Sequence, residues 1–289
     1  MSLYREFSSQ EEIDAQYNIG ASMPGWESWL VRYAEDSEAT RQSIECTLNV
    51  PYGPTLDEHM DIFPSAKPNS PVLVFIHGGY WRALSSKETN FLAGKFVEQG
   101  VTVAHVNYSL CPGVGITEIT RQCRAAVAWL HQHAADYNGD AKRIFVSGHS
   151  AGGHLTAMVC STNWVDDYGL PADFVRGGIP ISGIFDLRPI RYSYLQPVLM
   201  IDDETTRRSS PHVNLPTQAP PMLISVGEKE SAEFRRQSID YQAQLAQSGF
   251  QSTVQVESDD DHFSILYTFI NERSPRFINS MKLIESTPG

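Results

Sequence analysis

The 289-residue sequence lacks the cysteine patterns of metal centres and disulfide frameworks. No C-x-x-C pair occurs, and the few cysteines are widely separated, so neither a zinc site nor a disulfide scaffold is predicted. We expect reduced thiols in a cytoplasmic protein. The four residues are Cys46, Cys111, Cys123 and Cys160.

Long apolar runs and an excess of basic residues are also missing. No apolar run approaches the ~18 residues that a membrane-spanning helix needs. The polar segment Met1–Gln10 has no apolar core of a secretory signal. Asp and Glu number 34 against 22 Lys and Arg, which gives a formal net charge of −12. An acidic protein repels phosphate backbones, so we exclude nucleic acid as a partner and expect a soluble, cytoplasmic protein.

Most of the chain alternates between strand and helix patterns. Two segments with alternating apolar and polar residues, Ile44–Val50 and His59–Phe63, predict an antiparallel hairpin at a sheet edge. Apolar or β-branched runs predict six buried strands at Val72–Ile76, Val101–Val106, Arg143–Ser147, Gly178–Ser182, Met222–Val226 and Ser252–Val256. Helices are predicted at Ser86–Gln99, Thr117–Ala135, Ala151–Thr162 and Ser231–Gln247. The pattern predicts one α/β domain over residues 1–289, with a mostly parallel eight-stranded sheet between helices.

Two segments do not fit this alternation. Residues 1–42 precede the first strand and are rich in aromatic side chains, and residues 186–216 lie between two strands. We interpret them as an N-terminal cap and a lid-like insertion over the carboxyl edge of the sheet, where open α/β sheets bind ligands. The alternatives are a disordered tail and a plain surface loop.

The sharpest motif is Gly148-His149-Ser150-Ala151-Gly152, a G-x-S-x-G pentapeptide. A predicted strand enters it and a helical segment of small residues leaves it. In that context the motif holds a nucleophilic serine on a tight strand-to-helix turn, whereas the pentapeptide alone also occurs as a packed glycine turn. The context favours Ser150 as the nucleophile of an acyl-transfer reaction.

A second glycine-rich segment, His77-Gly78-Gly79-Tyr80-Trp81, directly follows the predicted strand Val72–Ile76. Acyl transfer develops negative charge on the carbonyl oxygen, and backbone N–H groups aimed at that oxygen stabilise it. Glycines let the backbone approach the substrate without an intervening Cβ. We therefore assign Gly78 and Gly79 as oxyanion donors, joined by the N–H of Ala151. The alternative is a glycine turn after a strand.

The base should come late in the chain, because the order in such hydrolases is serine, acid, histidine. Only His212 and His262 lie beyond His154. His262 follows the last predicted strand, where the base loop falls, and is assigned as the base. His212 precedes the penultimate strand, Met222–Val226, and is interpreted as a surface or lid residue.

The acid should follow the strand Met222–Val226, where the loop offers two glutamates and no aspartate. We prefer Glu230, since either Asp or Glu can orient a neutral imidazole. Glu228 and Asp186 remain alternatives. The run Asp259-Asp260-Asp261 beside the base is interpreted as a solvated charged loop.

Together these motifs resemble the kynurenine formamidase branch of the α/β-hydrolase superfamily, which is related to hormone-sensitive-lipase-type esterases. His77–Trp81 is similar to the H-G-G-x-W signature of that family, and Ser182–Leu187, Val226–Ser238 and Asp261–Phe263 are further matches. The resemblance runs from Val72 to Ile270. One departure is clear: the family's catalytic aspartate falls on Glu230, which supports Glu230 over Glu228.

The resemblance implies an α/β-hydrolase fold and hydrolysis of N-formyl-L-kynurenine to kynurenine and formate in tryptophan catabolism. The substrate is a small molecule, and the mechanism needs no metal or organic cofactor. Tyr80, Trp81 and Trp164 are candidates for an aromatic substrate pocket, with core packing as the alternative, and His149 is a candidate substrate contact.

Two competing hypotheses remain at this point. One is a carboxylesterase or aryl-amidase of the hormone-sensitive-lipase type that acts on another small substrate. The other is an inactive hydrolase fold that serves as a binding protein, which the intact Ser150 and His262 disfavour. Oligomeric state leaves no mark in the sequence, so a homodimer stays open.

Overall fold

The sheet contains every strand that the sequence predicts. The structure is a computed structural model that describes residues 2–286, so Met1 and residues 287–289 of the predicted domain lie outside the described residues. Within this part of the chain, eight strands form one sheet in the order β1-β2-β4-β3-β5-β6-β7-β8. Their bounds are β1 Thr47–Pro51, β2 His59–Phe63, β3 Ser70–Ile76, β4 Thr102–Val106, β5 Gly139–His149, β6 Val175–Ile181, β7 Met222–Gly227 and β8 Ser252–Glu257.

The predicted hairpin and the mostly parallel sheet are confirmed. β2 pairs antiparallel with β1 and with β4, and all other neighbouring strands are parallel. Because parallel strands bring their carboxyl ends to one edge, the loops after β3, β5, β7 and β8 meet there. These four loops carry Gly78, Ser150, Glu230 and His262.

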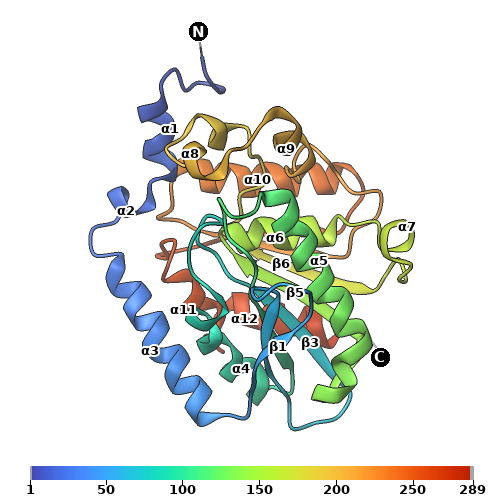
Figure 1. Cartoon of the computed structure of the whole chain (residues 1–289). Coiled ribbons are helices and arrows are strands. Elements are labelled where there is room, and N and C mark those ends of the chain that lie inside the picture. The colour runs from blue at the N-terminus through green and yellow to red at the C-terminus, as the bar shows by residue number, and fades with distance from the viewer. Residues whose placement is uncertain (1, 287–289) are drawn as a thin grey trace.

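Helices cover both faces of the sheet and its carboxyl edge (Figure 1). The α-helices in the described residues are α1 Gln10–Tyr17, α2 Ile19–Ser22, α3 Glu27–Ser43, α4 Ala93–Glu98, α5 Ile116–His133, α6 Ala151–Cys160, α7 Trp164–Tyr168, α8 Gln196–Leu199, α9 Asp203–Arg208, α10 Ala232–Gln247, α11 Ile265–Phe269 and α12 Pro275–Glu285. Short 3-10 helices are η1 Ser86–Glu88, η2 Asn90–Leu92, η3 Ala134–Tyr137 and η4 Pro189–Tyr192. In residues 2–286, no helix is long and apolar enough to cross a membrane.

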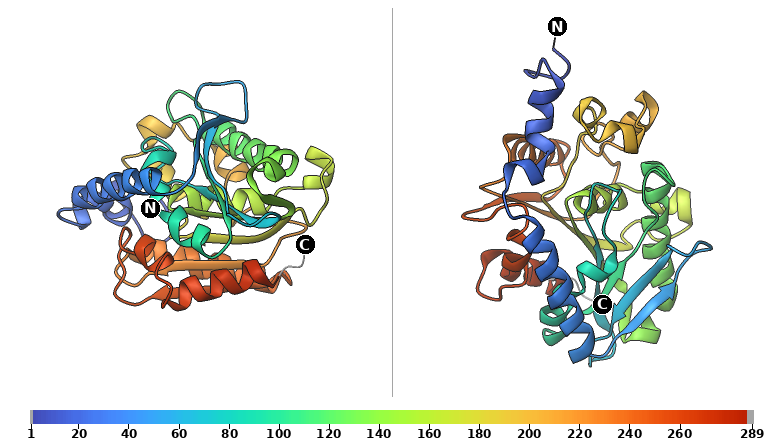
Figure 2. Two further views of the ribbon diagram at one scale, coloured as in Figure 1. Left: turned by 90° about the horizontal axis from the view of Figure 1, so that it is seen from below. Right: turned by 60° about the vertical axis from the view of Figure 1, so that its left-hand side comes forward.

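Two apolar cores lie on opposite faces of the sheet, because successive side chains of a strand point to opposite sides. On one face, α5, α6 and α10 pack against strand residues such as Val74 and Val146. On the other, α4, α11 and α12 pack against Phe75 and Phe145. Figure 2 shows α5 and α12 on opposite sides of the sheet. Every residue of β3 is buried, as expected for a strand covered on both faces.

The helix predicted over Ser86–Gln99 is wrong in its first half, where η1 and η2 precede the short helix α4. The reason lies in β2. Asp61 is fully buried, and it accepts hydrogen bonds from the Ser86 hydroxyl at 2.9 Å and from the Lys87 ammonium at 2.5 Å. A buried carboxylate needs such partners, so η1 packs over β2 instead of continuing as one regular helix.

The N-terminal segment forms helices that pack on the rest of the chain, so the disordered-tail alternative is wrong. Figure 1 shows α3 running along one side of the molecule and α1 beside the 186–216 insertion, which contains η4, α8 and α9. The N–H of Tyr194 in the insertion donates to the carboxylate of Asp14 on α1 at 2.6 Å. The two segments that broke the sequence pattern therefore contact each other.

Candidate active site

Ser150 occupies the turn between β5 and α6 in a backbone conformation that L-residues rarely adopt, with φ 58° and ψ −117°. The glycines around it are required by close contacts. A Cβ on Gly148 would lie 2.3 Å from the carbonyl oxygen of Gly152, and a Cβ on Gly152 would lie 2.0 Å from that of Ile76. The N–H of Ser150 donates to the carbonyl of Ile181 at 2.9 Å. This strained turn presents Ser150 at the amino end of α6.

His262 lies after β8, and its Nδ1 is 2.6 Å from Oε2 of Glu230. The second oxygen of Glu230 accepts from the Ser182 hydroxyl at 2.5 Å and from the N–H of Gly227 at 2.6 Å. Both side chains of the pair are buried, with 6% and 1% exposed. Three donors fix the buried carboxylate and compensate its charge. The carboxylate in turn favours the tautomer with a proton on Nδ1, which leaves Nε2 free to act as a base.

The two alternative acids do not contact the base. Glu228 is exposed to solvent. Asp186 is buried, but its carboxylate accepts from the Tyr4 hydroxyl at 2.8 Å and pairs with the Arg188 guanidinium at 2.6 Å. Among residues 2–286, Glu230 is therefore the carboxylate that hydrogen-bonds to His262.

The interpretation of the aspartate run as a solvated loop is wrong for two of its three members. Asp259 is exposed. Asp260 is buried and accepts from the Ser264 hydroxyl at 2.8 Å. Asp261 accepts from the N–H groups of Phe263 and Ser264, both at 2.8 Å, and so shapes the turn on which the base sits.

The loop after β3 lies against the serine turn. An ideal Cβ on Gly78 would be 3.2 Å from the Cβ of Ser150, so the backbone there approaches the nucleophile closely. Gly79 has φ +102°, and a Cβ on it would lie 2.1 Å from the carbonyl oxygen of Ala83. The hydroxyl of Tyr108 donates to the carbonyl of His77 at 2.9 Å. These contacts fix the path of the loop beside Ser150.

The three predicted oxyanion donors are available at this edge. Within the described residues, no hydrogen bond uses the N–H of Gly78 or Gly79. Ala151 is the first residue of α6, where a helix leaves its N–H groups without intrahelical partners and the macrodipole favours negative charge. The arrangement can therefore receive an oxyanion formed next to Ser150.

Ser150 and His262 open onto a cavity of about 270 Å³. Much of its wall comes from the N-terminal helices, and Tyr194 adds a contribution from the insertion. The apolar residues of this wall that the sequence analysis did not assign to the site are Ile19, Trp26, Leu30, Tyr33, Ala83, Leu84, Tyr194, Phe263 and Leu266. No motif surrounds them, and only the aromatic content of residues 1–42 pointed toward that segment.

The N-terminal helices are fastened to the catalytic loops. Tyr33 on α3 donates to the carbonyl of Phe263, the residue after the base, at 2.5 Å. Tyr17 at the end of α1 is buried, and its hydroxyl donates to Glu233 on α10 at 2.9 Å. The Tyr80 hydroxyl donates to the carbonyl of Tyr17 at 2.6 Å. The cavity wall is thereby tied to both the loop that carries His262 and the loop that carries Gly78 and Gly79.

Two of the predicted substrate contacts line this cavity, namely Tyr80 and His149. The His149 ring lies 4.6 Å from the His262 ring, centroid to centroid. Burial holds the pKa of His149 well below its usual range, with the neighbouring His262 adding to the effect. His149 is therefore neutral at physiological pH and adds no charge beside the base.

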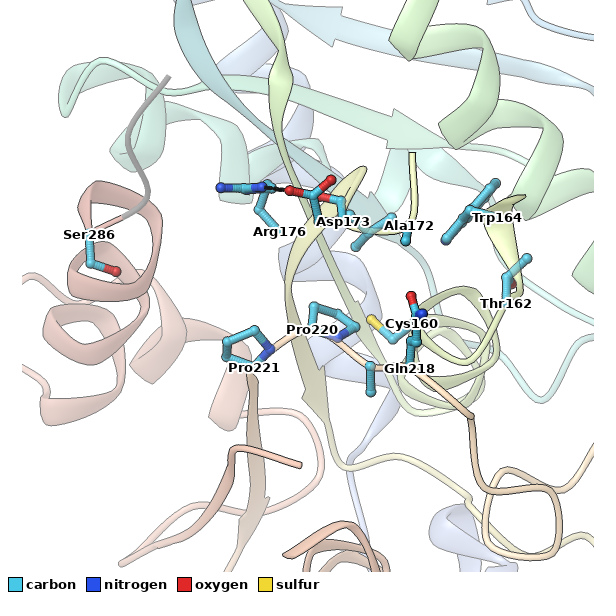
Figure 3. Close-up of a pocket in the computed structure, with 12 residues that line it drawn as sticks. Cys160, Thr162, Trp164, Ala172, Asp173, Arg176, Gln218, Pro220, Pro221 and Ser286 are labelled. Carbon is cyan, nitrogen blue, oxygen red and sulfur yellow. Dashed lines mark hydrogen bonds and ion pairs between the residues drawn. The ribbon is translucent and has the colours of Figure 1, made fainter. Parts of the chain in front are cut away.

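The other two aromatic residues lie elsewhere, so their predicted pocket roles are wrong. Trp81 is fully buried and donates from Nε1 to His154 at 3.2 Å. Trp164 lines a separate cavity of about 400 Å³, together with Cys160 and Pro220 (Figure 3). That cavity lies near the start of β6, at the opposite end of the strand from the site.

The parallel sheet, the serine turn and the buried glutamate–histidine pair define an α/β-hydrolase. A family profile described as BD-FAE matches residues 60–245. A kynurenine formamidase from Danio rerio is 31% identical over 277 residues, which cover 91% of this chain and 92% of that protein. The chain belongs to the BD-FAE family of hydrolases, in the branch that contains the kynurenine formamidases.

Solved structures share the fold of this chain. A candidate thioesterase from Silicibacter sp. TM1040 shares the fold with a TM-score of 0.79 and 29% identity, over 91% of this chain and 97% of that one. An esterase from the hyperthermophilic archaeon Pyrobaculum calidifontis has a TM-score of 0.74 at 17% identity, over 90% and 92% of the two chains. The second likeness shows the fold alone.

Proposed function

We propose that the protein is an arylformamidase that hydrolyses N-formyl-L-kynurenine to kynurenine and formate. One observation carries the proposal: His262, which forms a buried 2.6 Å hydrogen bond with Glu230, lines the same cavity as Ser150, Gly78 and Gly79. The kynurenine formamidase from Danio rerio, which aligns over nearly the whole chain, supports the choice of substrate.

In the first half of the reaction, the Ser150 oxygen attacks the formyl carbon while Nε2 of His262 takes the hydroxyl proton. Glu230 holds the imidazole in orientation and stabilises the imidazolium that forms. The carbonyl oxygen becomes an oxyanion and is bound by the N–H groups of Gly78, Gly79 and Ala151. The C–N bond then breaks, and His262 returns the proton to the leaving aryl amine.

In the second half, a water molecule attacks the formyl ester on Ser150. His262 removes a proton from this water, and the same three N–H groups bind the second oxyanion. Collapse breaks the ester bond, returns the proton to Ser150 and releases formate. Every proton transfer in this scheme passes through Nε2 of His262.

The cavity suits a small aromatic substrate. Its volume of about 270 Å³ lies near the lower end of the range of small-molecule sites. Trp26, Tyr33 and Leu30 provide aromatic and aliphatic surface for an aryl ring. We further propose that residues 1–42 and 186–216 act as the cap over this site. The cytoplasmic location and the homodimer remain predictions.

The decisive experiment is turnover of N-formyl-L-kynurenine by the purified protein, followed through kynurenine absorbance, beside p-nitrophenyl esters of short and medium acyl chains. We expect efficient deformylation that is lost in Ser150→Ala. Ester hydrolysis with negligible deformylation would overturn the proposed substrate and move the function to a carboxylesterase or amidase, with the same catalytic residues.

A further inference from the structure

Arg82 places a cation at the cavity. It belongs to the same loop as the proposed oxyanion donors, and its N–H donates to the carbonyl of Gly79 at 3.0 Å. Its side chain lines the cavity, with the guanidinium carbon 5.8 Å from the centroid of the Tyr194 ring, another lining residue. The loop that would receive the oxyanion therefore also carries a positive charge.

In the part of the chain that the structure describes, this charge has no carboxylate partner. Within residues 2–286, Arg82 forms no ion pair with any carboxylate. Asp14, whose carboxylate accepts from the N–H of Tyr194, is engaged there at 2.6 Å and also accepts from Gln10. Among the described residues that line the cavity, Arg82 is the one whose side chain is ionisable, histidines and tyrosines apart.

A neighbouring lysine offers a contrast. Lys229 lines an adjoining cavity of about 240 Å³ that also reaches His262. Its ammonium lies 3.5 Å from the Asp259 carboxylate, and both side chains are largely exposed. Lys229 is thus already paired outside the Ser150 cavity, whereas Arg82 faces that cavity without a counter-ion.

We propose that Arg82 is a specificity-determining residue that binds a carboxylate carried by the substrate, on the part of the molecule away from the scissile bond. The inference rests on the proposed function for the identity of the scissile group. The acyl group of a substrate is held at Ser150, beside the proposed oxyanion donors. The rest of the substrate then lies against the cavity wall, which includes Arg82. A guanidinium matches a carboxylate in a bidentate geometry, and the cation–π contact with Tyr194 holds it beside the cavity.

The charge of the whole protein strengthens the argument. With a net charge of −12, the molecule repels an anionic substrate at long range. Arg82 is a local cation in an otherwise neutral, largely apolar cavity. It therefore attracts an anionic substrate at the site, although the protein as a whole repels it. An uncharged substrate would gain nothing from Arg82, and an exposed unpaired arginine contributes little to folding.

The test uses two formamides that differ only in that a methyl group replaces the carboxylate: 3-(2-formamidobenzoyl)propanoate and neutral N-(2-butanoylphenyl)formamide. Arg82→Met should raise KM for the propanoate roughly tenfold or more, while KM for the neutral formamide changes less than about twofold. Arg82→Lys should restore part of the affinity, and the control Lys229→Met should leave both KM values unchanged. Equal effects of Arg82→Met on both substrates, or a selective effect of Lys229→Met, would overturn the proposal.

A second readout separates this inference from the proposed function. 3-Benzoylpropanoate and butyrophenone, an acid and a neutral ketone without a formamide, are compared as inhibitors of p-nitrophenyl acetate hydrolysis. The inference expects the acid to inhibit better, with that advantage lost in Arg82→Met. This result holds even if no formamide is cleaved. Inhibition by the acid that Arg82→Met leaves intact would refute the role of Arg82.

Discussion

The indole Nε1–H of Trp81 donates to Nδ1 of His154 over 3.2 Å, which joins the loop after β3 to helix α6. The other ring nitrogen of His154 lies 2.6 Å from the carbonyl oxygen of Ser209 in the 186–216 insertion. Only the neutral tautomer with a proton on Nε2 satisfies both contacts, because a proton on Nδ1 would face the indole donor. A single buried imidazole thus connects three segments around the site.

This contact predicts a pH-dependent stability. Burial lowers the pKa of His154 from 6.5 to about 4. Because the folded pKa is below the unfolded one, its stabilising contribution is complete above the unfolded pKa and is lost as pH falls through the folded pKa. His154→Gln, which keeps one donor and one acceptor, should reduce the pH slope of the free energy of unfolding by about 1.4 kcal/mol per pH unit in that window.

Urea unfolding across that pH window would measure this slope. Burial also lowers the pKa of His77 to about 4 and that of His105 to about 3, so the His154→Gln variant should still lose some stability in acid. An unchanged slope in His154→Gln would contradict the prediction.

Glu230→Gln should lower kcat by roughly 10²- to 10⁴-fold with little effect on folding, because a neutral amide fails to hold the required histidine tautomer and to stabilise the imidazolium. Glu228→Gln is the control, since Glu228 lies in the same loop but is exposed. Steady-state kinetics on the best substrate, together with thermal unfolding, would measure both variants. Similar activity in the two would remove Glu230 from the proposed triad.

Gly79→Ala should reduce activity roughly 100-fold or more, because the added Cβ would collide with the Ala83 carbonyl and displace an oxyanion donor. Gly94→Ala is the matched control. No atom lies within 4 Å of a Cβ there, and α4 should gain about 0.5–1 kcal/mol of stability from the better helix former. Kinetics and denaturant unfolding of both variants would test this. Loss of activity in Gly79→Ala but not in Gly94→Ala would show that the collision at Gly79, and not the replacement of a glycine in general, impairs catalysis.

Ser150→Ala and His262→Ala should each lower kcat by roughly 10⁴- to 10⁶-fold, since the nucleophile and the base act as a unit. Both variants should remain folded. Active-site labelling with a fluorophosphonate should modify the wild-type protein and leave Ser150→Ala unlabelled. Retained activity in either variant would show that the nucleophile or the base had been assigned to the wrong residue.

The sequence was sufficient to predict the sheet because its signals are local. Buried strands such as β3 are short apolar runs, and the glycines beside Ser150 are demanded by contacts at 2.0–2.3 Å that no other residue tolerates. The break between η1 and α4 could not be predicted, because it depends on Asp61, which is distant in sequence and reaches the turn only in the folded chain.

The site shows the same division between local and distant signals. Ser150, Glu230 and His262 follow recognisable strands, so their meeting at one edge could be predicted, although their catalytic roles remain predictions. The cavity wall could not be predicted. Ile19 and Leu30 lie on helices with no motif, and their place depends on tertiary bonds such as that from Tyr33 to Phe263. Trp81 belongs to the glycine-rich motif after β3, but its side chain packs in the core. Its indole N–H donates to His154 and is not available to a substrate.

The fastening of α3 to the base loop has an evolutionary consequence. The proposed reacting groups come from loops within the sheet, whereas much of the wall that a substrate would touch comes from residues that precede the first strand. The proposed chemistry, together with Arg82, and much of the apolar wall are therefore encoded in separate stretches of the gene. Recombination that exchanges the stretch before β1 between relatives can retune selectivity while the reaction itself is inherited intact.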